Sequence, residues 1–455
     1  MAMLVTSALC GCRPTPPPPT VVLISIDTLR RDHLPFYGYE RETAPRWSEL
    51  AQESVIFDGA IAVHTNTGPS HASMLTGLYP PQHGILRNRY RLRRGVRTLA
   101  EELTENGFET AAFVSGQTMT DQLTGLGRGF ALYDDDMGVV WEREARSTWQ
   151  RARVWLKARD PERPLFLFFH LFDPHSPYRP PVELAQRFLP EGTAEPRFPS
   201  PVDIARVRRG HAEPGELDAY VAAYDGEIAH ADSYMGRLLH LLRKLGLYEN
   251  SVIIVTSDHG ETLGERPYAF DHGARLYEEQ IRVPLTIRLP GGEHAGTRVG
   301  SIARHIDLAP TVLDLLGVDP WPVPGRSLRS SWTGGQAPDT TTFSFARPVA
   351  ARVPEVTGPL AETGLLAALR RPPEKLIAYP TVSGAWVYQL FDLGDDPAER
   401  EDRASLDPER TGELAAELEG WLATVGRLDH KPSEVAPEDL EALRSLGYLG
   451  SSDQP

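Results

Sequence analysis

The stretch Val21-Val22-Leu23-Ile24-Ser25-Ile26 is a short, almost continuously apolar run that leads into Asp27. Three further apolar runs also lead into polar residues, and they span 110–114, 165–169 and 252–255. Runs of this length are typical of strands that are buried on both faces of a sheet. Between them, Leu217–Leu245 repeats apolar residues at helix spacing and is followed by Gly246, a common helix stop. Alternating strands and helices predict an α/β sandwich around a large, mostly parallel sheet.

Polar side chains follow three of these predicted strands at the point where each strand ends. They are Asp27 after the first run, His170, Asp173 and His175 after the third, and Asp258 and His259 after the fourth. In open α/β sheets, ligands bind beyond the carboxyl ends of the strands. The sequence therefore predicts that these side chains contribute to one site.

A different signal lies in the run Thr67-Gly68-Pro69-Ser70-His71-Ala72-Ser73-Met74-Leu75-Thr76-Gly77. Pro69 suits the first position of a helix, and Gly77 suits its end. Thr67 would then lie just before a helix N-terminus, where free N–H groups favour an anion. A hydroxyl in this position becomes nucleophilic when a metal or a base lowers its pKa. The alternative interpretation is that Thr67 only caps the helix.

Composition narrows the class of protein. With 455 residues and 41% hydrophobic content, the chain can bury one large core and a smaller second one. A formal charge of −15 argues against nucleic acid and anionic lipid headgroups as electrostatic partners. The only two cysteines are Cys10 and Cys12, so a metal in the folded body must be held by oxygen and imidazole ligands.

The N-terminus has the features of an export signal. Residues 1–11 form a short apolar segment, and Leu9-Cys10-Gly11-Cys12 resembles a bacterial lipobox. By this resemblance Cys12 would carry lipid, and the proline-rich tract up to Pro19 would act as a stiff spacer. We expect an exported bacterial lipoprotein that is anchored to the membrane, in the periplasm or at the cell surface. A plain export signal and a misassigned start codon are the alternatives.

Four regions are expected along the chain. They are a signal and spacer (1–19), a catalytic domain (20–338), a small α+β domain (339–425) and a tail (426–455). Within the catalytic domain, Leu189–Glu216 has little periodicity and indicates a surface insertion, whereas Ile302–Leu316 indicates a helix. Short strands at 365–369, 376–379 and 386–393, followed by a polar helix, predict a small antiparallel sheet in the C-terminal domain.

The Thr67–Gly77 run resembles the signature loop of the sulfatase family, within the alkaline phosphatase superfamily. That loop reads Cys/Ser-x-Pro-Ser-Arg and ends in Thr-Gly about five residues later. In sulfatases the Cys or Ser is oxidised to formylglycine, but this chain has Thr67 there and His71 in place of the Arg. The resemblance covers residues 20–425 and implies the α/β fold of the superfamily.

The same resemblance implies a metal site. Asp27 matches the first metal carboxylate of the family, whose usual second Asp is Thr28 here. Asp258-His259 matches a segment that reads Asp-Asn in calcium sulfatases and Asp-His in the phosphatase branches. We expect one divalent ion held by Asp27, Asp258 and His259, with the Thr67 hydroxyl at the same ion. An imidazole ligand favours Zn²⁺ or Mn²⁺, and Ca²⁺ stays an alternative.

Further matches concern the substrate. By resemblance, His175 and His272 would contact the ester oxygens, and His272 replaces a family Lys in the segment that continues to Tyr277-Glu278. Many sulfatases have Lys-Trp-His near Ser115 and Gln117, so most of the cationic sulfate clamp is absent. A second metal at Asp173, His175 and His272 is a further hypothesis. Structural roles are the open alternative for His71, His175 and His272, and the favoured one for His64, Glu227, Asp232 and Asp307.

These observations predict a metal-dependent hydrolase of ester bonds with a covalent intermediate at Thr67. Phosphate mono- or diesters are favoured, because a threonine ester lacks the second hydroxyl through which formylglycine hydrate releases sulfate. The alternatives are a sulfate ester hydrolase, a membrane-tethered transferase of phospho-headgroups, and an inactive binding protein. Expected partners are a small-molecule, glycan or lipid ester and, through the lipid anchor only, the membrane; nucleic acid is not expected.

Overall fold

The computed structural model describes residues 18–138, 140–192, 195–207, 209–266, 270–335, 341–347, 365–381 and 383–425. The predicted export signal, the lipobox and the tail at 426–455 lie outside the described residues. None of the described helices is both long and apolar enough to cross a membrane.

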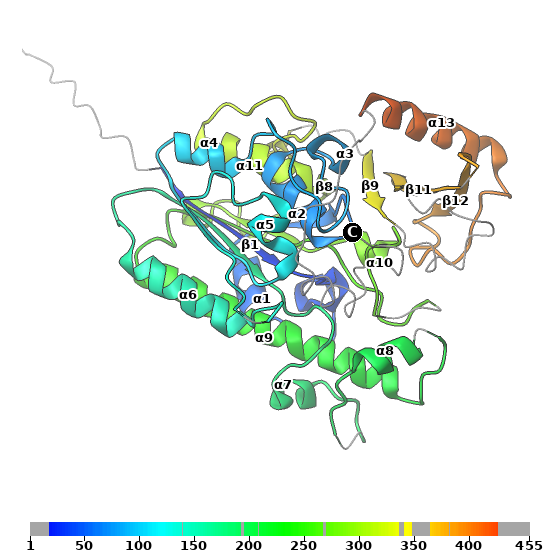
Figure 1. Ribbon diagram of the computed structural model, residues 1–455, viewed down its shortest axis with the longest axis horizontal. Helices are drawn as coiled ribbons and strands as arrows, with labels where there is room; N and C mark the ends of the chain where they lie inside the picture. Colours follow the sequence, from blue (N-terminus) through cyan, green and yellow to red (C-terminus); the bar gives the residue numbers. More distant parts are fainter. Residues whose placement is uncertain are drawn as a thin grey trace, which may run out of the picture.

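An eight-stranded sheet forms the centre of the molecule (Figure 1). Its order is β4-β3-β5-β1-β6-β7-β2-β8, and only β7 runs antiparallel to its neighbours. The strands are β1 (Thr20–Ile26), β2 (Val55–Ile61), β3 (Glu109–Phe113), β4 (Leu132–Asp134), β5 (Leu165–Leu171), β6 (Ser251–Ser257), β7 (Leu285–Arg288) and β8 (Arg298–Arg304). The predicted α/β sandwich around a mostly parallel sheet is confirmed.

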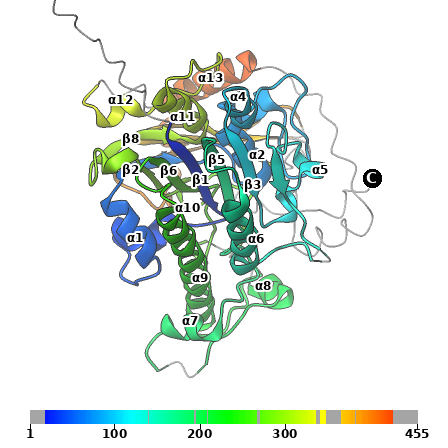
Figure 2. The ribbon, with the colours of Figure 1, turned by 90° about the vertical axis from the view of Figure 1, so that its left-hand side faces the viewer.

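Helices cover both faces of the sheet, as Figure 2 shows. One face is covered by α2 (Thr67–Thr76), α4 (Leu99–Glu105), α11 (Leu308–Leu316) and α12 (Arg329–Trp332). The other is covered by α1 (Pro45–Gln52), α6 (Ala145–Ala158) and α9 (Glu216–Lys244). Shorter helices are α3 (Pro80–His83), α5 (Asp121–Thr124), α7 (Val182–Arg187), α8 (Pro201–Val207) and α10 (Glu278–Ile281).

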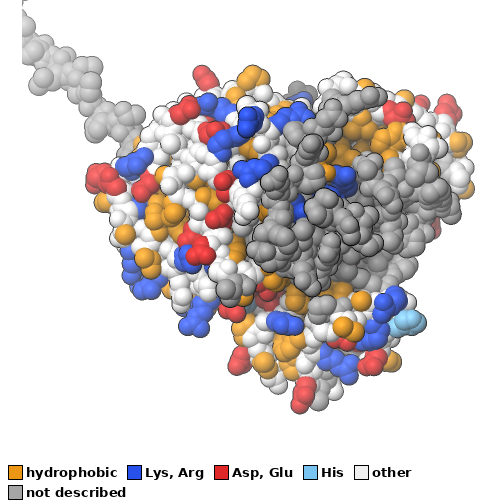
Figure 3. Space-filling view, in the orientation of Figure 1, with side chains coloured by type: hydrophobic (Ala, Val, Ile, Leu, Met, Phe, Trp, Pro, Cys, Tyr) orange, Lys and Arg blue, Asp and Glu red, His pale blue; other side chains and the backbone are white. Residues whose placement is uncertain are grey.

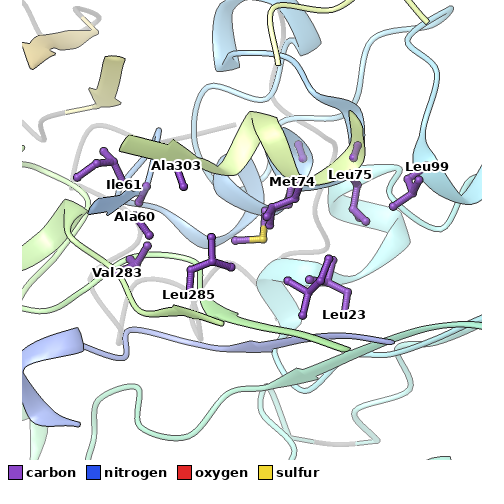
Figure 4. Packing of buried hydrophobic residues seen from close by; sticks show 14 of the residues in the cluster. Leu23, Ala60, Ile61, Met74, Leu75, Leu99, Val283, Leu285 and Ala303 are labelled. Carbon is purple, nitrogen blue, oxygen red and sulfur yellow. The ribbon is translucent and has the colours of Figure 1, made fainter. Parts of the chain in front are cut away.

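The two helical layers explain why the central strands are apolar throughout. Along β1, Leu23 packs into the core on the α2 side, whereas its neighbour Ile24 packs into the core on the α9 side. Figure 4 shows Leu23 and Leu285 facing Met74 of α2. Each fully buried side chain of this size contributes roughly 1.5–3 kcal/mol. The packing of Leu23 and Leu285 against Met74 therefore holds helix α2 over one face of the sheet.

A second, antiparallel sheet follows, with the order β12-β11-β10-β9. Its strands are β9 (Thr342–Ala346), β10 (Leu366–Arg371), β11 (Glu374–Pro380) and β12 (Trp386–Asp392), and α13 (Pro408–Thr424) packs against them. The predicted small antiparallel sheet is confirmed, although the sequence analysis did not include β9. The domain boundaries themselves stay a prediction.

The two sheets are joined by a buried ion network. Lys375 of β11 is fully buried, and its Nζ lies 2.7 Å from Glu399 Oε1 and 3.1 Å from Glu278 Oε1. Arg370 of β10 also pairs with Glu278, at 3.1 Å. Burial favours the neutral carboxyl, yet Lys375 and Arg370 lower the pKa of Glu278 to about 2. The Tyr277-Glu278 pair that follows His272 thus attaches its loop to the second sheet.

Two local predictions were wrong. Ile302–Ala303 continue strand β8 rather than a helix, because they pair with β2, and α11 begins only at Leu308. The segment 189–216, predicted as a surface insertion, contains the short helix α8. Helix α2 begins at Thr67 itself with Asn66 as its N-cap residue, so Thr67 lies in the first helical turn rather than before it. Its predicted end at Gly77, with φ of 73°, is confirmed.

Candidate active site

The carboxyl ends of two adjacent parallel strands bring the central acidic residues together. β1 pairs with β6 so that Ile26 lies opposite Ser257, which places Asp27 and Asp258 one residue further on at the same edge. His259 follows directly, and helix α2 presents Thr67 from above the sheet. All four side chains are fully buried. The parallel register is thus what assembles residues that are more than 200 positions apart.

Asp27, Asp258 and His259 each direct a polar atom without a hydrogen-bond partner toward the other two side chains. His259 Nε2 lies 3.3 Å from Asp258 Oδ2 and 3.9 Å from Asp27 Oδ1. None of these three atoms has a hydrogen-bond partner. The potential ligand atoms of the three residues lie within 4.8 Å of one another. Buried polar atoms without partners are costly, so this arrangement fits a divalent ion among two carboxylates and an imidazole.

The surrounding backbone orients this ligand set. Asp258 Oδ1 accepts hydrogen bonds from the N–H groups of Thr28 and His259, at 3.1 and 2.9 Å. His259 Nδ1 lies 3.0 Å from the Gly260 carbonyl oxygen, to which it donates its proton. That hydrogen bond leaves the lone pair on Nε2 directed at the carboxylates, as a metal ligand requires. Thr28, which replaces the second Asp of the family, contributes its N–H and not a carboxylate.

The electrostatics of the two carboxylates also fit a cation. Burial, together with the nearby Asp258 and Glu261, raises the pKa of Asp27 well above its ordinary value. Burial acts in the same direction on Asp258, but the imidazoles around it, His259 first, hold its pKa below the ordinary value. Burial lowers the pKa of His259 to about 4, which keeps its ring neutral near pH 7. A cation at this position would favour the ionised form of Asp27.

Thr67 lies directly beside this cluster. Its Oγ1 is 3.4 Å from Asp27 Oδ2 and forms a hydrogen bond with it. The N–H of Gly68 donates to Asn88 Oδ1 at 2.8 Å, which holds the start of α2 in place. Free N–H groups and the helix dipole make this end of α2 attractive to an anion. A hydroxyl, a carboxylate that can accept its proton and an anion site therefore meet at one point.

The ring of His71 packs behind Thr67 and does not belong to the cluster of Asp27, Asp258 and His259. Its Nδ1 is 2.8 Å from the Thr67 carbonyl oxygen, and its Nε2 is 2.8 Å from Ser25 Oγ. The distance from His71 Nδ1 to Asp258 Oδ2 is 3.9 Å. Because both ring nitrogens contact protein groups, this geometry favours a positioning role for His71 over contact with a substrate.

His175 and His272 form a pair beside the acidic cluster. Their ring centroids are 4.9 Å apart, and that of His272 is 4.6 Å from His259. His272 Nδ1 lies 3.2 Å from Glu261 Oε1, and although burial opposes it, Glu261 raises the pKa of His272 above its ordinary value. Burial and the neighbouring His272 lower the pKa of His175 well below its ordinary value. The surroundings thus raise the pKa of one imidazole of this pair and lower the pKa of the other.

Three residues near the cluster were not assigned as metal ligands or catalytic residues from the sequence, although His170 was expected to contribute to the site. His170 Nε2 lies 3.4 Å from Asp27 Oδ2 and has no hydrogen-bond partner. Asn88 Nδ2 is likewise buried without a partner. Ser70 Oγ donates to the Asp258 carbonyl oxygen and contacts His305 Nδ1 at 2.8 Å. The position of His170 at the end of an apolar run was a detectable signal, but nothing in the local sequence marked Asn88.

Several residues without a predicted catalytic role have structural partners. Asp232 accepts from the N–H groups of Arg46 and Trp47 at the start of α1, and the two nitrogens of His64 contact backbone groups. Asp307 occupies the N-cap position of α11, but its carboxylate bonds Arg304 and the N–H of Arg326 and does not cap that helix.

The hypothetical second metal site does not assemble as expected. Asp173 Oδ1 lies 3.1 Å from His230 Nδ1 on α9, and Glu227 of the same helix completes a group with them. Among the described residues, neither His175 nor His272 belongs to that group. Asp173 therefore belongs to a different cluster from the one the sequence suggested.

An α/β sandwich with a buried Asp–Asp–His cluster and a hydroxyl at a helix N-terminus defines a class of metal-dependent ester hydrolases. A family model described as Sulfatase matches residues 19–318, which is more than half of the chain. The protein therefore belongs to the sulfatase family of the alkaline phosphatase superfamily. It is a hydrolase that acts on ester bonds, and enzymes of this family depend on a metal.

Two curated relatives illustrate the range of the family. The chain is 25% identical to N-acetylglucosamine-6-O-sulfatase of Bacteroides thetaiotaomicron over 393 residues, 68% of this chain and 70% of the relative. It is 26% identical to the multifunctional alkaline phosphatase superfamily protein PehA of Trinickia caryophylli over 407 residues, 71% of this chain and 78% of the relative.

Two solved structures share the fold. The phosphonate monoester hydrolase of Agrobacterium radiobacter has a TM-score of 0.71 and 23% identity, and the alignment covers 92% of this chain and 98% of that one. A protein in complex with its substrate D-glucosamine-2-N,6-O-disulfate has a TM-score of 0.73 and 22% identity, covering 92% of this chain and all of that one. At these identities the likeness concerns the fold alone.

Proposed function

We propose that the protein hydrolyses phosphate mono- or diesters through a covalent intermediate on Thr67. The observation that carries this proposal is the Thr67 hydroxyl at the N-terminus of α2, 3.4 Å from Asp27 Oδ2 and beside the Asp27–Asp258–His259 cluster. No described residue is a cysteine. Formylglycine formed from cysteine is thus absent from the described site, and the threonine hydroxyl is the nucleophile that the geometry offers.

Asp27, Asp258 and His259 are the proposed metal ligands, with Thr67 adjacent to them. A divalent ion bound there would lower the pKa of the Thr67 hydroxyl and polarise an ester oxygen; Zn²⁺ or Mn²⁺ suits the imidazole, with Ca²⁺ as the alternative. Thr67 Oγ1 attacks phosphorus in line, its proton passes to a base such as Asp27, and the P–O bond to the alcohol breaks. Water then attacks phosphorus and breaks its bond to Thr67 Oγ1, which frees phosphate from a monoester, or a phosphate monoester from a diester, and regenerates the threonine.

His272 and His175 are proposed to act on the oxygens of the reacting group. His272, whose pKa Glu261 raises, is suited to protonate the departing alkoxide. His175 lies next to it and is proposed to contact an equatorial oxygen; because its Nδ1 donates to the Ser176 carbonyl oxygen at 2.6 Å, its Nε2 donates to the ester only when the ring is cationic. His71 holds the Thr67 carbonyl and so keeps the nucleophile in position. The three histidines thus have distinct proposed roles around one ester group.

Phosphorus chemistry is favoured because of the fate of the intermediate. A phosphothreonine can be cleaved by water at phosphorus, whereas a sulfothreonine lacks the second hydroxyl that releases sulfate from formylglycine hydrate. The multifunctional relative of the alkaline phosphatase superfamily supports this choice. Sulfate ester hydrolysis is the second candidate, because the N-acetylglucosamine-6-O-sulfatase is also a relative.

The test compares turnover of p-nitrophenyl phosphate, bis-p-nitrophenyl phosphate and p-nitrophenyl sulfate by the metal-loaded protein. We expect the larger kcat/KM for one of the two phosphate esters, with that activity abolished in Thr67→Ala. Turnover of the sulfate ester above both phosphate esters, and dependent on Thr67, would replace this proposal with the sulfatase alternative.

The pH dependence of turnover tests the role of His272. Since Glu261 raises its pKa, the cationic form should persist above the ordinary imidazole value, and kcat/KM should fall on the alkaline side as the proton is lost. His272→Lys places an amine with an ordinary pKa of about 10.4 in the same position and should move this alkaline limb upward. The measurement is kcat/KM against pH; an alkaline limb at the same pH in both proteins would exclude His272 as its origin.

The N-terminal features support a location outside the cytoplasm. By the resemblance of residues 9–12 to a lipobox, the protein would be a bacterial lipoprotein lipidated on Cys12. Its ester substrate would then be a small molecule, a glycan or a lipid that reaches the periplasm or the cell surface.

A further inference from the structure

A groove on the α9 side of the sheet collects positive charge at a distance from the active site. Its volume is about 750 Å³, and α1, α6 and α9 line it. Its cationic side chains are Arg46, Arg153, Lys157, Arg237, Arg243 and Lys244, with His240 beside them. Figure 3 shows Lys and Arg side chains along the lower left of the molecule, over α6. This concentration contrasts with the formal charge of −15 for the whole chain.

Four of these cations are not neutralised by carboxylates. Arg153, Lys157, Arg237 and Lys244 are exposed, and within the part of the chain that the structure describes no carboxylate lies at ion-pair distance from them. Cations in the last turn of a helix stabilise its dipole, which accounts for Lys157 and Lys244. Arg153 and Arg237 lie further from the helix ends, so this explanation does not cover them.

The groove also contains aromatic and apolar surface. The guanidinium groups of Arg153 and Arg237 lie 5.5 and 5.6 Å from the ring centre of Trp149. Val154 and Leu245 do not line the groove but follow two of its cations in the sequence, and they are 67% and 38% exposed. Cations combined with Trp and exposed aliphatic side chains are typical of surfaces that contact the headgroup region of a membrane.

The groove lies at the end of the sheet where the chain enters the fold. The N–H of Thr20, the first residue of β1, donates to the Asn250 carbonyl oxygen at 2.9 Å, six residues after the end of α9. Helix α6 likewise ends seven residues before β5, which pairs with β1. Both helices therefore end near the amino edge of the sheet, whereas Asp27 and Asp258 follow the carboxyl ends of β1 and β6.

We propose that this basic groove is a docking surface for anionic phospholipid headgroups and holds the active site facing away from the membrane. By the lipobox resemblance the chain would be anchored through Cys12, eight residues before Thr20 at the start of β1. Salt screens charges that are more than a Debye length of ~10 Å apart. The cations of the groove therefore act on a nearby surface more strongly than the distant carboxylates of the chain do. The inference is independent of the ester that the enzyme hydrolyses.

The test measures co-sedimentation of the full chain with vesicles. Cys12→Ser removes the acylation site in every sample, so that a lipid anchor does not mask the groove. We expect binding to vesicles of phosphatidylcholine with phosphatidylglycerol, weaker binding at high salt, and little binding to phosphatidylcholine alone. Each Lys or Arg near an anionic surface contributes about fivefold in affinity. Arg153→Gln, Lys157→Gln, Arg237→Gln and Lys244→Gln together should therefore reduce binding by more than about a hundredfold.

The control removes the same number of exposed cationic side chains, four, from the α11 side of the molecule, by Arg91→Gln, Arg94→Gln, Arg326→Gln and Arg329→Gln. The control should retain most of the vesicle binding, and both quadruple variants should keep the thermal midpoint and the esterase kcat/KM of the parent. Equal loss in both variants would mean that only the overall charge matters and would overturn the proposal. So would vesicle binding that does not require phosphatidylglycerol. Binding to heparin without binding to vesicles would instead assign the groove to an anionic polysaccharide.

Discussion

Thr67→Ala is expected to lower kcat for the preferred ester by about a thousandfold or more, because removal of a nucleophile abolishes the covalent route. The folded state should persist, since Thr67 forms only one side-chain hydrogen bond, at 3.4 Å, with Asp27. The measurement is kcat with metal-loaded protein, together with the thermal midpoint. Thr67→Ser retains a hydroxyl at the same position and should recover much of the lost rate.

Thr76→Ala is a matched control for that experiment. Thr76 lies at the other end of the same helix, and its hydroxyl donates only to the Ala72 carbonyl oxygen. This change should cost some stability and leave kcat near that of the parent. A Thr67→Ala protein that keeps full activity would exclude the proposed intermediate, and water activated at the cluster would then have to attack the ester directly.

Asp27→Asn is expected to weaken metal binding without lowering the stability of the metal-free protein. Loss of one carboxylate ligand should weaken divalent ion binding by more than about a hundredfold, since even outer-shell partners cost 10–100-fold. Burial and the neighbouring carboxylates raise the pKa of Asp27, so the ionised form is unfavourable in the metal-free protein. The neutral amide relieves this repulsion, and the thermal midpoint of the metal-free variant should equal or exceed that of the parent.

Thermal denaturation with and without Zn²⁺ or Mn²⁺ measures both effects. Saturating metal, at a hundred times its Kd, should stabilise the parent by about 2.7 kcal/mol, and the shift should vanish in Asp27→Asn. Asp232→Asn is the control, because burial raises the pKa of this carboxyl too, to about 7, but it lies under α1. An undiminished metal-induced shift in Asp27→Asn would exclude Asp27 from the ligand set.

Local sequence patterns were sufficient to predict the main architecture. The apolar run 21–26 requires burial on both faces, and the structure places β1 between two helical layers. The helix 217–245 and the glycine stop of α2 at Gly77 were also predictable, because helix spacing and a left-handed C-terminal glycine act locally. Strand β8 was mistaken for helix, since its few apolar residues acquire strand geometry only by pairing with β2.

The candidate site was predictable only in part. Asp27, Asp258 and His259 each follow a buried strand, so the rule for parallel sheets predicted that they meet. The place of Asn88 beside Gly68 and the orientation of His71 towards Ser25 depend on how distant loops pack, and no local pattern encodes that. Asp173 was assigned to the wrong neighbours for the same reason, because its partner His230 comes from α9.

The sequence by itself determined the α/β class, the apolar central strands, the oxygen and imidazole chemistry of the site and the hydroxyl in place of a sulfatase cysteine. These properties follow from residue type and short-range periodicity. Only the tertiary structure decided which polar atoms of Asp27, Asp258 and His259 converge, which histidine has a raised pKa, and where positive charge collects on α6 and α9. Those properties depend on distances between residues far apart in the chain, which the register of the sheet and the packing of helices over it establish.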